Sequence, residues 1–200
     1  MRLECMDNIE LMKEYPNGYF DLAIVDPPYG ISVNMNMGRK KGKRKNYEDK
    51  KWDDNVPSNF YFDELFRVSK NQIIWGGNYF DLGPTRHFIF WDKQIPQGLS
   101  FSDGEMAWTS FDMAIKKYTL ANKQDNRIHP TQKPVKLYKW LLANYAKQGD
   151  KILDTHLGSG SIAIACHDLG FDLTACEIDK DYFDKSMKRL NDFKLQTKLL

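Results

Sequence analysis

The sequence predicts an α/β protein built on a mostly parallel, doubly wound sheet. Short apolar runs bounded by turn residues alternate along the chain with stretches of helical periodicity. Two of these runs end in unusual segments, one rich in proline at residues 26–29 and one rich in glycine at residues 154–161. Ligands bind beyond the carboxyl ends of parallel strands, so both segments are expected at the same edge of the sheet.

Five apolar runs have the length and composition of buried strands. They lie at residues 20–25, 72–75, 87–91, 151–153 and 172–176.

The clearest helix is predicted over residues 134–147, where Leu137, Trp140, Leu141 and Tyr145 share one face. A second helix fits residues 161–169, and a third begins after residue 179. A strand lies between the last two. Strand, turn, helix, strand and helix form the right-handed βαβ unit of a parallel sheet that is covered on both faces.

Composition indicates one compact domain over residues 1–200, because 42% hydrophobic and 14% aromatic residues are sufficient for one core. No apolar stretch approaches the roughly 18 residues that a membrane span requires, and no signal-peptide pattern is present, so a cytoplasmic protein is expected. Three cysteines without close pairing and four histidines without ligand spacing give no support to a disulfide framework or a metal site.

Positive charge is concentrated in one segment. Residues 39–51 hold eight Lys or Arg against two acids, which is +6 locally and leaves −4 for the rest of a chain whose net charge is +2. The surrounding stretch, residues 31–57, lacks periodicity and is predicted to be a long loop. Its basic block is either a solvated loop or a nucleic-acid contact.

Polar residues follow five predicted strands and should gather along one edge of the sheet, which is the predicted site. These residues are Asp26, the stretch 76–78, the stretch 91–93, Asp154 and Glu177.

The glycine-rich turn suits a nucleoside better than a dinucleotide. Gly158 and Gly160 allow a ligand close to the backbone, and Glu177 stands where an acid accepts hydrogen bonds from ribose hydroxyls. Position 163 is Ala rather than a third glycine, and Asp154 would repel a pyrophosphate, so a cationic nucleoside fits better. The alternative is an ordinary strand-to-helix turn with a surface acid.

The loop at residues 129–134 is stiffened by two prolines and offers a hydroxyl, an amide and an ammonium group before a helix. Such a loop can hold a carboxylate. The alternative is a rigid connection with Lys133 in solvent.

The proline-rich segment is suited to a flat ring that carries an amino group. The Asp26 carboxylate and the Pro27 carbonyl can accept hydrogen bonds from an exocyclic amine, which localises its lone pair, and Tyr29 can stack on the ring. Successive prolines fix these acceptors in place. Two half-sites on one chain predict a group-transfer enzyme.

These segments together resemble the S-adenosylmethionine-dependent DNA methyltransferases that modify adenine N6 or cytosine N4. The resemblance identifies residues 26–29 as the catalytic motif, residues 129–134 as the methionine-binding loop, residues 154–161 as the glycine-rich turn and Glu177 as the ribose-binding acid. It spans most of the chain. Thr155 and His156 depart from the family, which commonly has Pro and Phe there.

The resemblance implies a Rossmann-like class I methyltransferase fold with the circularly permuted motif order of the beta class. Its implied catalytic residues are Asp26, Pro27, Pro28 and Tyr29. Its implied S-adenosylmethionine ligands are Asp7, Thr131, Lys133, Asp154, Gly158, Ser159, Gly160, Ser161 and Glu177. For Asp7, a helix N-cap is an equal alternative to a contact with the cofactor's adenine.

The expected reaction is methylation of adenine N6 in DNA after the base rotates out of the duplex. The basic loop then supplies phosphate contacts through Arg39, Lys40, Lys41, Lys43, Arg44 and Lys45. The preference for adenine rests on the resemblance, because members with Asp at the first motif position usually modify adenine. Cytosine N4, RNA, or a non-catalytic nucleic-acid-binding role are the alternatives. The resemblance also suggests a homodimer and a restriction-modification setting.

Overall fold

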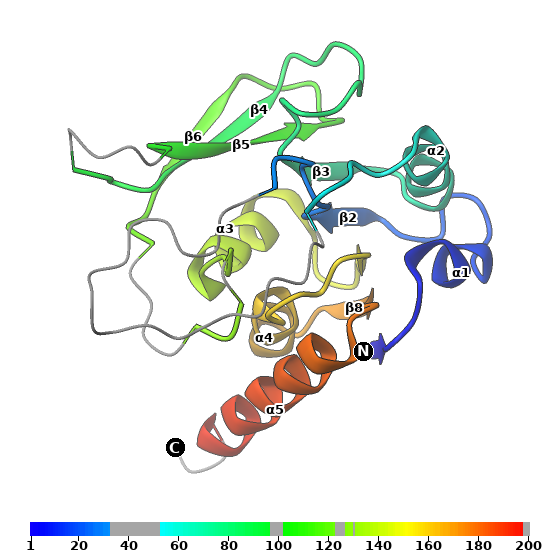
Figure 1. Ribbon diagram of the computed structural model, residues 1–200, viewed down its shortest axis with the longest axis vertical. Helices are drawn as coiled ribbons and strands as arrows, with labels where there is room; N and C mark the ends of the chain where they lie inside the picture. The colour runs from blue at the N-terminus through cyan, green and yellow to red at the C-terminus, as the bar shows by residue number, and fades with distance from the viewer. Residues whose placement is uncertain (33–52, 97–101, 123–126, 130, 198–200) are drawn as a thin grey trace.

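The computed structural model describes residues 1–32, 53–96, 102–122, 127–129 and 131–197. Within these residues the chain forms one sheet of eight strands flanked by helices on both faces (Figure 1). The strand order is β1-β8-β7-β2-β3-β5-β4-β6. The strands are β1 (Arg2–Glu4), β2 (Leu22–Val25), β3 (Gln72–Trp75), β4 (Phe88–Asp92), β5 (Gly104–Thr109), β6 (Lys116–Thr119), β7 (Lys151–Asp154) and β8 (Asp172–Cys176).

The sheet is parallel except at β5, which runs antiparallel to both β3 and β4. The predicted mostly parallel, doubly wound sheet is therefore confirmed. Strand β2 pairs with β7 in parallel, with Ala23 opposite Leu153. The proline-rich segment that follows β2 and the glycine-rich turn that follows β7 consequently leave the sheet at the same edge, although they are far apart in sequence.

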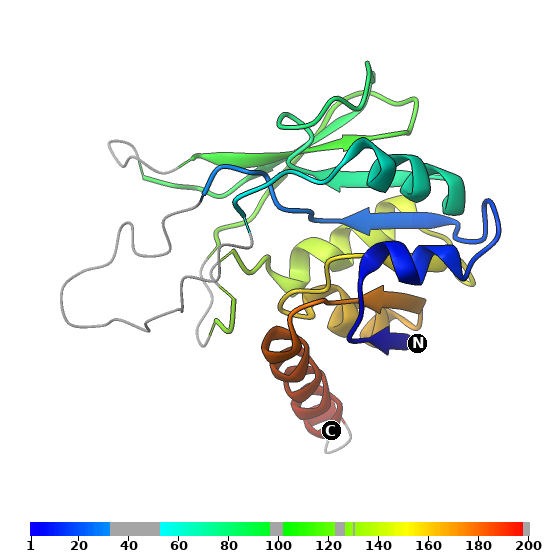
Figure 2. The ribbon, with the colours of Figure 1, turned by 45° about the vertical axis from the view of Figure 1, so that its right-hand side comes forward.

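Helices cover the sheet in two layers (Figures 1 and 2). The helices are α1 (Asn8–Lys13), α2 (Asn59–Val68), α3 (Val135–Tyr145), α4 (Ser161–Leu169) and α5 (Lys180–Thr197). Side chains of α1 and α2 pack with one cluster of buried residues, and those of α3, α4 and α5 pack with another. This arrangement follows from strand alternation, since Ile24 belongs to one cluster and its neighbours Ala23 and Val25 to the other.

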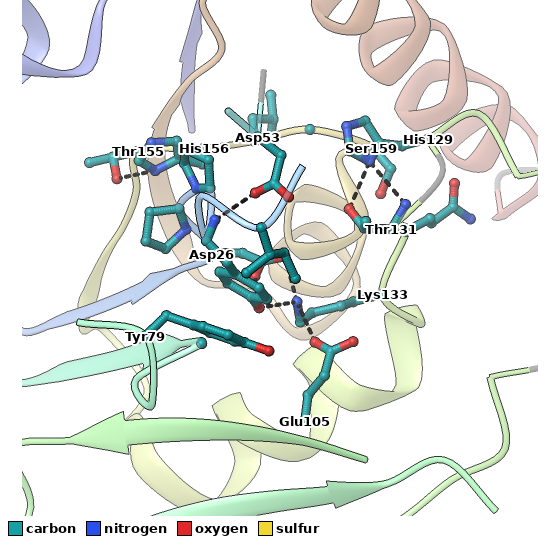
Figure 3. Close-up of a pocket in the computed structure, with 18 of the residues that line it drawn as sticks. Asp26, Asp53, Tyr79, Glu105, His129, Thr131, Lys133, Thr155, His156 and Ser159 are labelled. Carbon is teal, nitrogen blue, oxygen red and sulfur yellow. Dashed lines mark hydrogen bonds and ion pairs between the residues drawn. The ribbon is translucent and has the colours of Figure 1, made fainter. Parts of the chain in front are cut away.

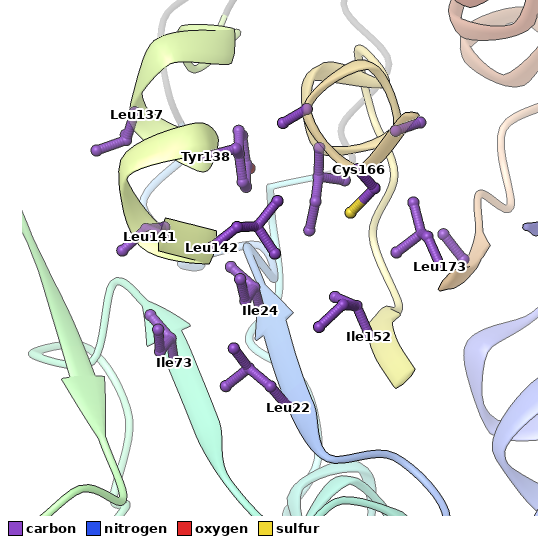
Figure 4. Close-up of a cluster of buried hydrophobic side chains, with 14 of the residues drawn as sticks. Leu22, Ile24, Ile73, Leu137, Tyr138, Leu141, Leu142, Ile152, Cys166 and Leu173 are labelled. Atoms are coloured by element: carbon purple, nitrogen blue, oxygen red, sulfur yellow. The ribbon is translucent and has the colours of Figure 1, made fainter. Parts of the chain in front are cut away.

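The larger cluster is formed where α3 and α4 lie on the sheet. Figure 4 shows Leu141 and Leu142 of α3 directed at Ile24 and Ile73 of the central strands, with Cys166 of α4 beside them. All five side chains are completely buried. Leu137 and Leu141 of the predicted apolar stripe lie on this buried surface together with Tyr138 and Leu142, whereas Trp140 and Tyr145 are only partly buried.

The predicted strands and the three predicted helices are present, with ends that shift by one or two residues. Strands β1, β5 and β6 and helix α2 were not predicted from the sequence, and helix α1 was anticipated only through the N-cap alternative for Asp7. Strand β6 has mostly exposed side chains and lies at the edge of the sheet, so it lacks an apolar run. Helix α2, in contrast, buries Tyr61, Leu65 and Val68 at helical spacing, and this pattern was available in the sequence.

Most of the predicted long loop, including all six proposed phosphate-contacting residues, lies outside the described residues. Its two flanks meet, because the Ser32 N–H donates a hydrogen bond to the Asp53 carbonyl over 3.2 Å. In the described ranges, no helix is long and apolar enough to cross a lipid bilayer.

Replacing Leu142 with Ala should lower the free energy of unfolding by about 2–5 kcal/mol, because it leaves a cavity between α3 and the sheet. Chemical denaturation measures this. Leu195→Ala is the matched control, since Leu195 is 63% exposed on α5. Equal losses for the two variants would contradict the assignment of the core.

Candidate active site

A cavity of about 730 Å³ opens at the carboxyl ends of the parallel strands, and residues of both predicted half-sites line it. The predicted site residues among its lining are Asp7, Asp26, Pro27, Pro28, Tyr29, Thr131, Lys133, Gly158, Ser159 and Glu177. Three others, Asp154, Gly160 and Ser161, lie behind the cavity wall and are almost fully buried. The two half-sites thus form one cavity.

Asp26 and Tyr29 are held together just beyond β2. The Tyr29 hydroxyl donates a hydrogen bond to Asp26 Oδ1 over 2.7 Å. The Tyr29 N–H donates to Asp53 Oδ1 over 2.7 Å, so a residue at the far end of the long loop fixes the turn. The Tyr79 ring stacks on that of Tyr29, with centroids 5.0 Å apart. The backbone and one face of Tyr29 are therefore fixed by other residues.

Gly76 explains how the Tyr29 ring fits against β3. Its φ is +71°, and a Cβ at this position would lie 2.1 Å from Tyr29 Cε1. Only glycine leaves this space at low conformational cost.

Lys133 brings the two half-sites into contact. Its ammonium group lies 2.5 Å from Asp26 Oδ2 and 2.9 Å from Glu105 Oε2 (Figure 3). Glu105 lies on β5, and its other oxygen is 2.5 Å from Lys93 Nζ. The Lys133 side chain is only 3% exposed, so the alternative that placed it in solvent is wrong.

The electrostatics of this group follow from burial and opposite charges. Burial raises the pKa of Asp26, and the nearby Lys133 charge opposes that rise without cancelling it. For Glu105, burial also acts upward, but Lys133 and Lys93 outweigh it and lower its pKa to about 2. Burial disfavours the charged form of Lys133, yet the two carboxylates raise its pKa. Glu105 and Lys133 are accordingly both ionised at neutral pH.

The glycine-rich turn is fixed from several sides. Glu177 accepts a hydrogen bond from the Gly158 N–H over 2.8 Å and another from the Asp179 N–H over 3.0 Å. Arg189 of α5 donates to the Ser159 carbonyl over 2.8 Å. The Ser161 hydroxyl donates to the Lys133 carbonyl over 2.7 Å, which joins this turn to the loop at residues 129–134.

Asp154 supports the turn from behind. Its Oδ1 accepts a hydrogen bond from the His156 N–H over 2.9 Å. Its side chain is buried, and burial raises its pKa to about 8 although this hydrogen bond acts in the opposite direction. Asp154 is then largely protonated at neutral pH.

The residues that depart from the family pattern form a polar chain instead of an apolar wall. His156 Nε2 lies 3.2 Å from the Asn8 amide nitrogen, and its Nδ1 lies 3.0 Å from Thr155 Oγ1. Thr155 in turn contacts the Tyr61 hydroxyl at 2.7 Å. Burial lowers the pKa of His156 to about 4, so the ring is neutral. These contacts place Asn8 and His156 in the cavity wall.

Asp7 is an N-cap, as one of its two interpretations predicted. Its Oδ1 accepts hydrogen bonds from the N–H groups of Ile9 at 2.8 Å and Glu10 at 3.2 Å. It also lines the cavity, so a ligand contact stays a prediction.

The chemistry of this end of the cavity fits a cationic nucleoside. Asp7, Glu177 and Asp179 line it, and Ile178 presents an apolar side chain that is 71% exposed. Carboxylates suit ribose hydroxyls and a positive charge, whereas they would repel a phosphate. Among the described residues, no group of three or more His, Cys, Asp or Glu could hold a metal ion.

Sequence reasoning missed Glu105, Asp53 and Tyr79, which lie in the cavity wall. Glu105 lies on a strand that has no continuous apolar run, and its position near Lys133 follows from the antiparallel pairing of β5 with β3 and β4. Asp53 adjoins a basic segment and looks like a surface acid in the sequence. Tyr79 directly follows the predicted stretch 76–78, which was the available signal.

Fold and cavity together define a group-transfer enzyme with a nucleoside-type cofactor site beside an acceptor site. The model of the N6/N4 DNA methylase family matches residues 74–188, more than half of the chain. The chain therefore belongs to this family and is an S-adenosylmethionine-dependent DNA methyltransferase.

Individual relatives extend the similarity over nearly the whole chain. Type II methyltransferase M.HpaI of Haemophilus parainfluenzae is 24% identical over 95% of this chain and 74% of its own length. Type II methyltransferase M.HinfI of Haemophilus influenzae is 23% identical over 94% of this chain and 67% of its own.

Solved structures confirm the Rossmann-like fold of class I methyltransferases. The M1.HpyAVI–SAM complex superimposes with a TM-score of 0.64 at 19% identity, covering 95% of this chain and 98% of the other. The cytosine-N4-specific PvuII DNA methyltransferase gives 0.61 at 12% identity, covering 96% and 90%.

Gly76→Ala should reduce methyl transfer on the order of 100-fold, because the new methyl group displaces the Tyr29 ring from its position beside Asp26. Gly83→Ala is the control. Gly83 has a similar φ of +74°, but a Cβ there meets nothing within 4 Å. Initial rates at saturating cofactor test this, and equal losses in the two variants would attribute the effect to backbone strain alone.

Asp154→Asn should flatten the pH dependence of stability. A pKa raised in the folded state contributes stability that is complete below the unfolded pKa and is lost as pH rises through the folded value, here from about 4 to about 8. The Tm of the wild-type protein should therefore fall relative to that of the variant between pH 5 and pH 8. Parallel Tm curves would show that Asp154 is ionised in the folded protein.

Proposed function

We propose that this protein methylates the exocyclic N6 of adenine in DNA, with the base rotated out of the duplex into the cavity. The single observation that carries the proposal is the shared cavity, in which Asp26 beyond β2 and the glycine-rich turn beyond β7 face the same space. One domain, residues 1–200, then holds acceptor and donor together.

In this proposal Asp26 and the Pro27 carbonyl accept hydrogen bonds from the target amine and localise its lone pair. Tyr29, stacked between Tyr79 and the cavity, supplies a flat surface for the base. The carboxylate of Asp26 also stabilises the positive charge that develops on the amine nitrogen. The residues act by alignment and polarisation, so no covalent intermediate with the protein is needed.

Bound S-adenosylmethionine supplies an electrophilic methyl group on a sulfonium sulfur. We propose that Glu177 holds its ribose, Asp7 its adenine end, and Thr131 its carboxylate. Lys133, which the sequence also assigned to that carboxylate, directs its ammonium group to Asp26 and Glu105 instead. Gly158 and Ser159 form the adjacent wall, while Asp154, Gly160 and Ser161 shape the turn from behind. Glu177 suits its role, because the two N–H donors hold its carboxylate in position while each oxygen keeps acceptor capacity.

DNA is proposed to contact the basic loop through Arg39, Lys40, Lys41, Lys43, Arg44 and Lys45. The support from the described residues is the position of the loop's flanks, because Ile31 and Asp53 both line the cavity. Cations supply most sequence-independent affinity for DNA, so this loop would bring the duplex to the acceptor site.

Asp26, at the first position of the catalytic motif, favours adenine over cytosine, because members of the family with Asp at this position usually modify adenine. Cytosine N4 is the alternative, since its amine can satisfy the same acceptors.

Replacing Asp26 with Ala should abolish methylation while cofactor affinity changes little, because Asp26 acts on the acceptor. The measurement combines labelled methyl transfer to unmodified genomic DNA with calorimetric cofactor binding. Glu177→Ala is the matched control and should weaken cofactor binding instead. Substantial turnover by the Asp26 variant would rule out the proposed mechanism.

The methylated base is identified by digesting the product DNA to nucleosides and analysing them by mass spectrometry. N6-methyladenine is the expected product. N4-methylcytosine would overturn the assignment of the base while leaving the acceptor mechanism in place.

A further inference from the structure

Both carboxylate oxygens of Asp26 already have partners. The Tyr29 hydroxyl donates to Oδ1 over 2.7 Å, and the Lys133 ammonium group lies 2.5 Å from Oδ2. Lys133 therefore occupies the Asp26 carboxylate, which in the proposed function accepts a hydrogen bond from the target amine.

Lys133 on Asp26 opposes the chemistry as well as the binding of the amine. Methyl transfer makes the amine nitrogen positive, and an ammonium group on the same carboxylate repels that charge. It also competes for the oxygen that the amine requires. The site works best when Lys133 has withdrawn from Asp26.

Withdrawal is costly for a buried cation unless a second anion remains beside it. Lys133 has such an anion, because Glu105 Oε2 lies 2.9 Å from its Nζ (Figure 3). Glu105 reaches the cavity from β5, a different element from the segment that holds Asp26. Its other oxygen is anchored by Lys93 at 2.5 Å.

We propose that Glu105 is a positioning residue that retains Lys133 when the target amine takes its place on Asp26 Oδ2. Lys133 covers the acceptor carboxylate in the absence of the base, and Glu105 holds the lysine after the exchange. This inference rests on the proposed function and adds a residue that acts through Lys133 rather than on the substrate.

The proposal predicts that Glu105 acts through Lys133. A residue that acts independently of Lys133 should matter equally with and without the lysine. A residue whose task is to retain the lysine should lose its importance once the lysine is gone. The two cases differ in a double-mutant cycle.

The test compares Glu105→Gln, Lys133→Met and the double variant in the full-length protein. Glu105→Gln keeps the side-chain shape but removes the charge, so Lys133 stays on Asp26. Methyl transfer in a single turnover at saturating cofactor should fall at least tenfold, while the cofactor Kd from calorimetry changes less than twofold. Adding Lys133→Met should restore at least part of that loss, since nothing then covers Asp26.

Two further variants serve as controls for this comparison. Asp168→Asn removes a carboxylate from the exposed pair with Lys139 and should leave the rate unchanged. Glu105→Asp keeps the charge and should retain more activity than Glu105→Gln, which distinguishes loss of charge from a folding defect.

Wild-type rates for Glu105→Gln, or a double variant as slow as the product of the two single effects, would overturn the inference. Failure of the proposed function gives a different result, because Asp26→Ala would then keep its activity in the same assay.

Discussion

The site depends on the buried ion pair between Lys133 and Asp26, which joins residues that are 107 positions apart in the chain. Removing one partner of such a pair typically costs about 3–5 kcal/mol, because the other charge is left without compensation. The pair is stable because Glu105 and Lys93 extend it into a group of two acids and two lysines. Charge is balanced inside the cavity, so a site rich in ionised groups can coexist with a tightly packed sheet.

Parallel pairing of β2 with β7 explains why the segments that follow these two strands line one cavity. The ends of adjacent parallel strands must lie at the same edge, so the proline-rich segment after β2 and the glycine-rich turn after β7 face one space. The surrounding packing then fixes each part: Gly76 leaves room for Tyr29, Asp53 holds its backbone, and Arg189 holds the glycine-rich turn.

The sequence predicted the parallel core of this fold and the position of both motifs at one edge of the sheet, because buried parallel strands are continuous apolar runs and each motif follows one of them. It could not predict β5, which begins with polar residues, or the edge strand β6, whose side chains are mostly exposed. Glu105 was missed for the same reason: its meaning comes from a long-range antiparallel pairing rather than from its neighbours. Lys133 was recognised as part of a motif, but its contact with Asp26 depends on the three-dimensional arrangement.

The central claim is that Asp26 receives the target amine in the cavity that also holds the cofactor. A crystal structure of the wild-type protein with a non-reactive cofactor analogue and a DNA duplex that carries the methylated site tests it most directly. The account predicts an extrahelical base whose exocyclic nitrogen lies within hydrogen-bonding distance of the Asp26 carboxylate, with the analogue's ribose on Glu177. A base that stays stacked in the duplex, or an amine bound away from Asp26, would contradict it.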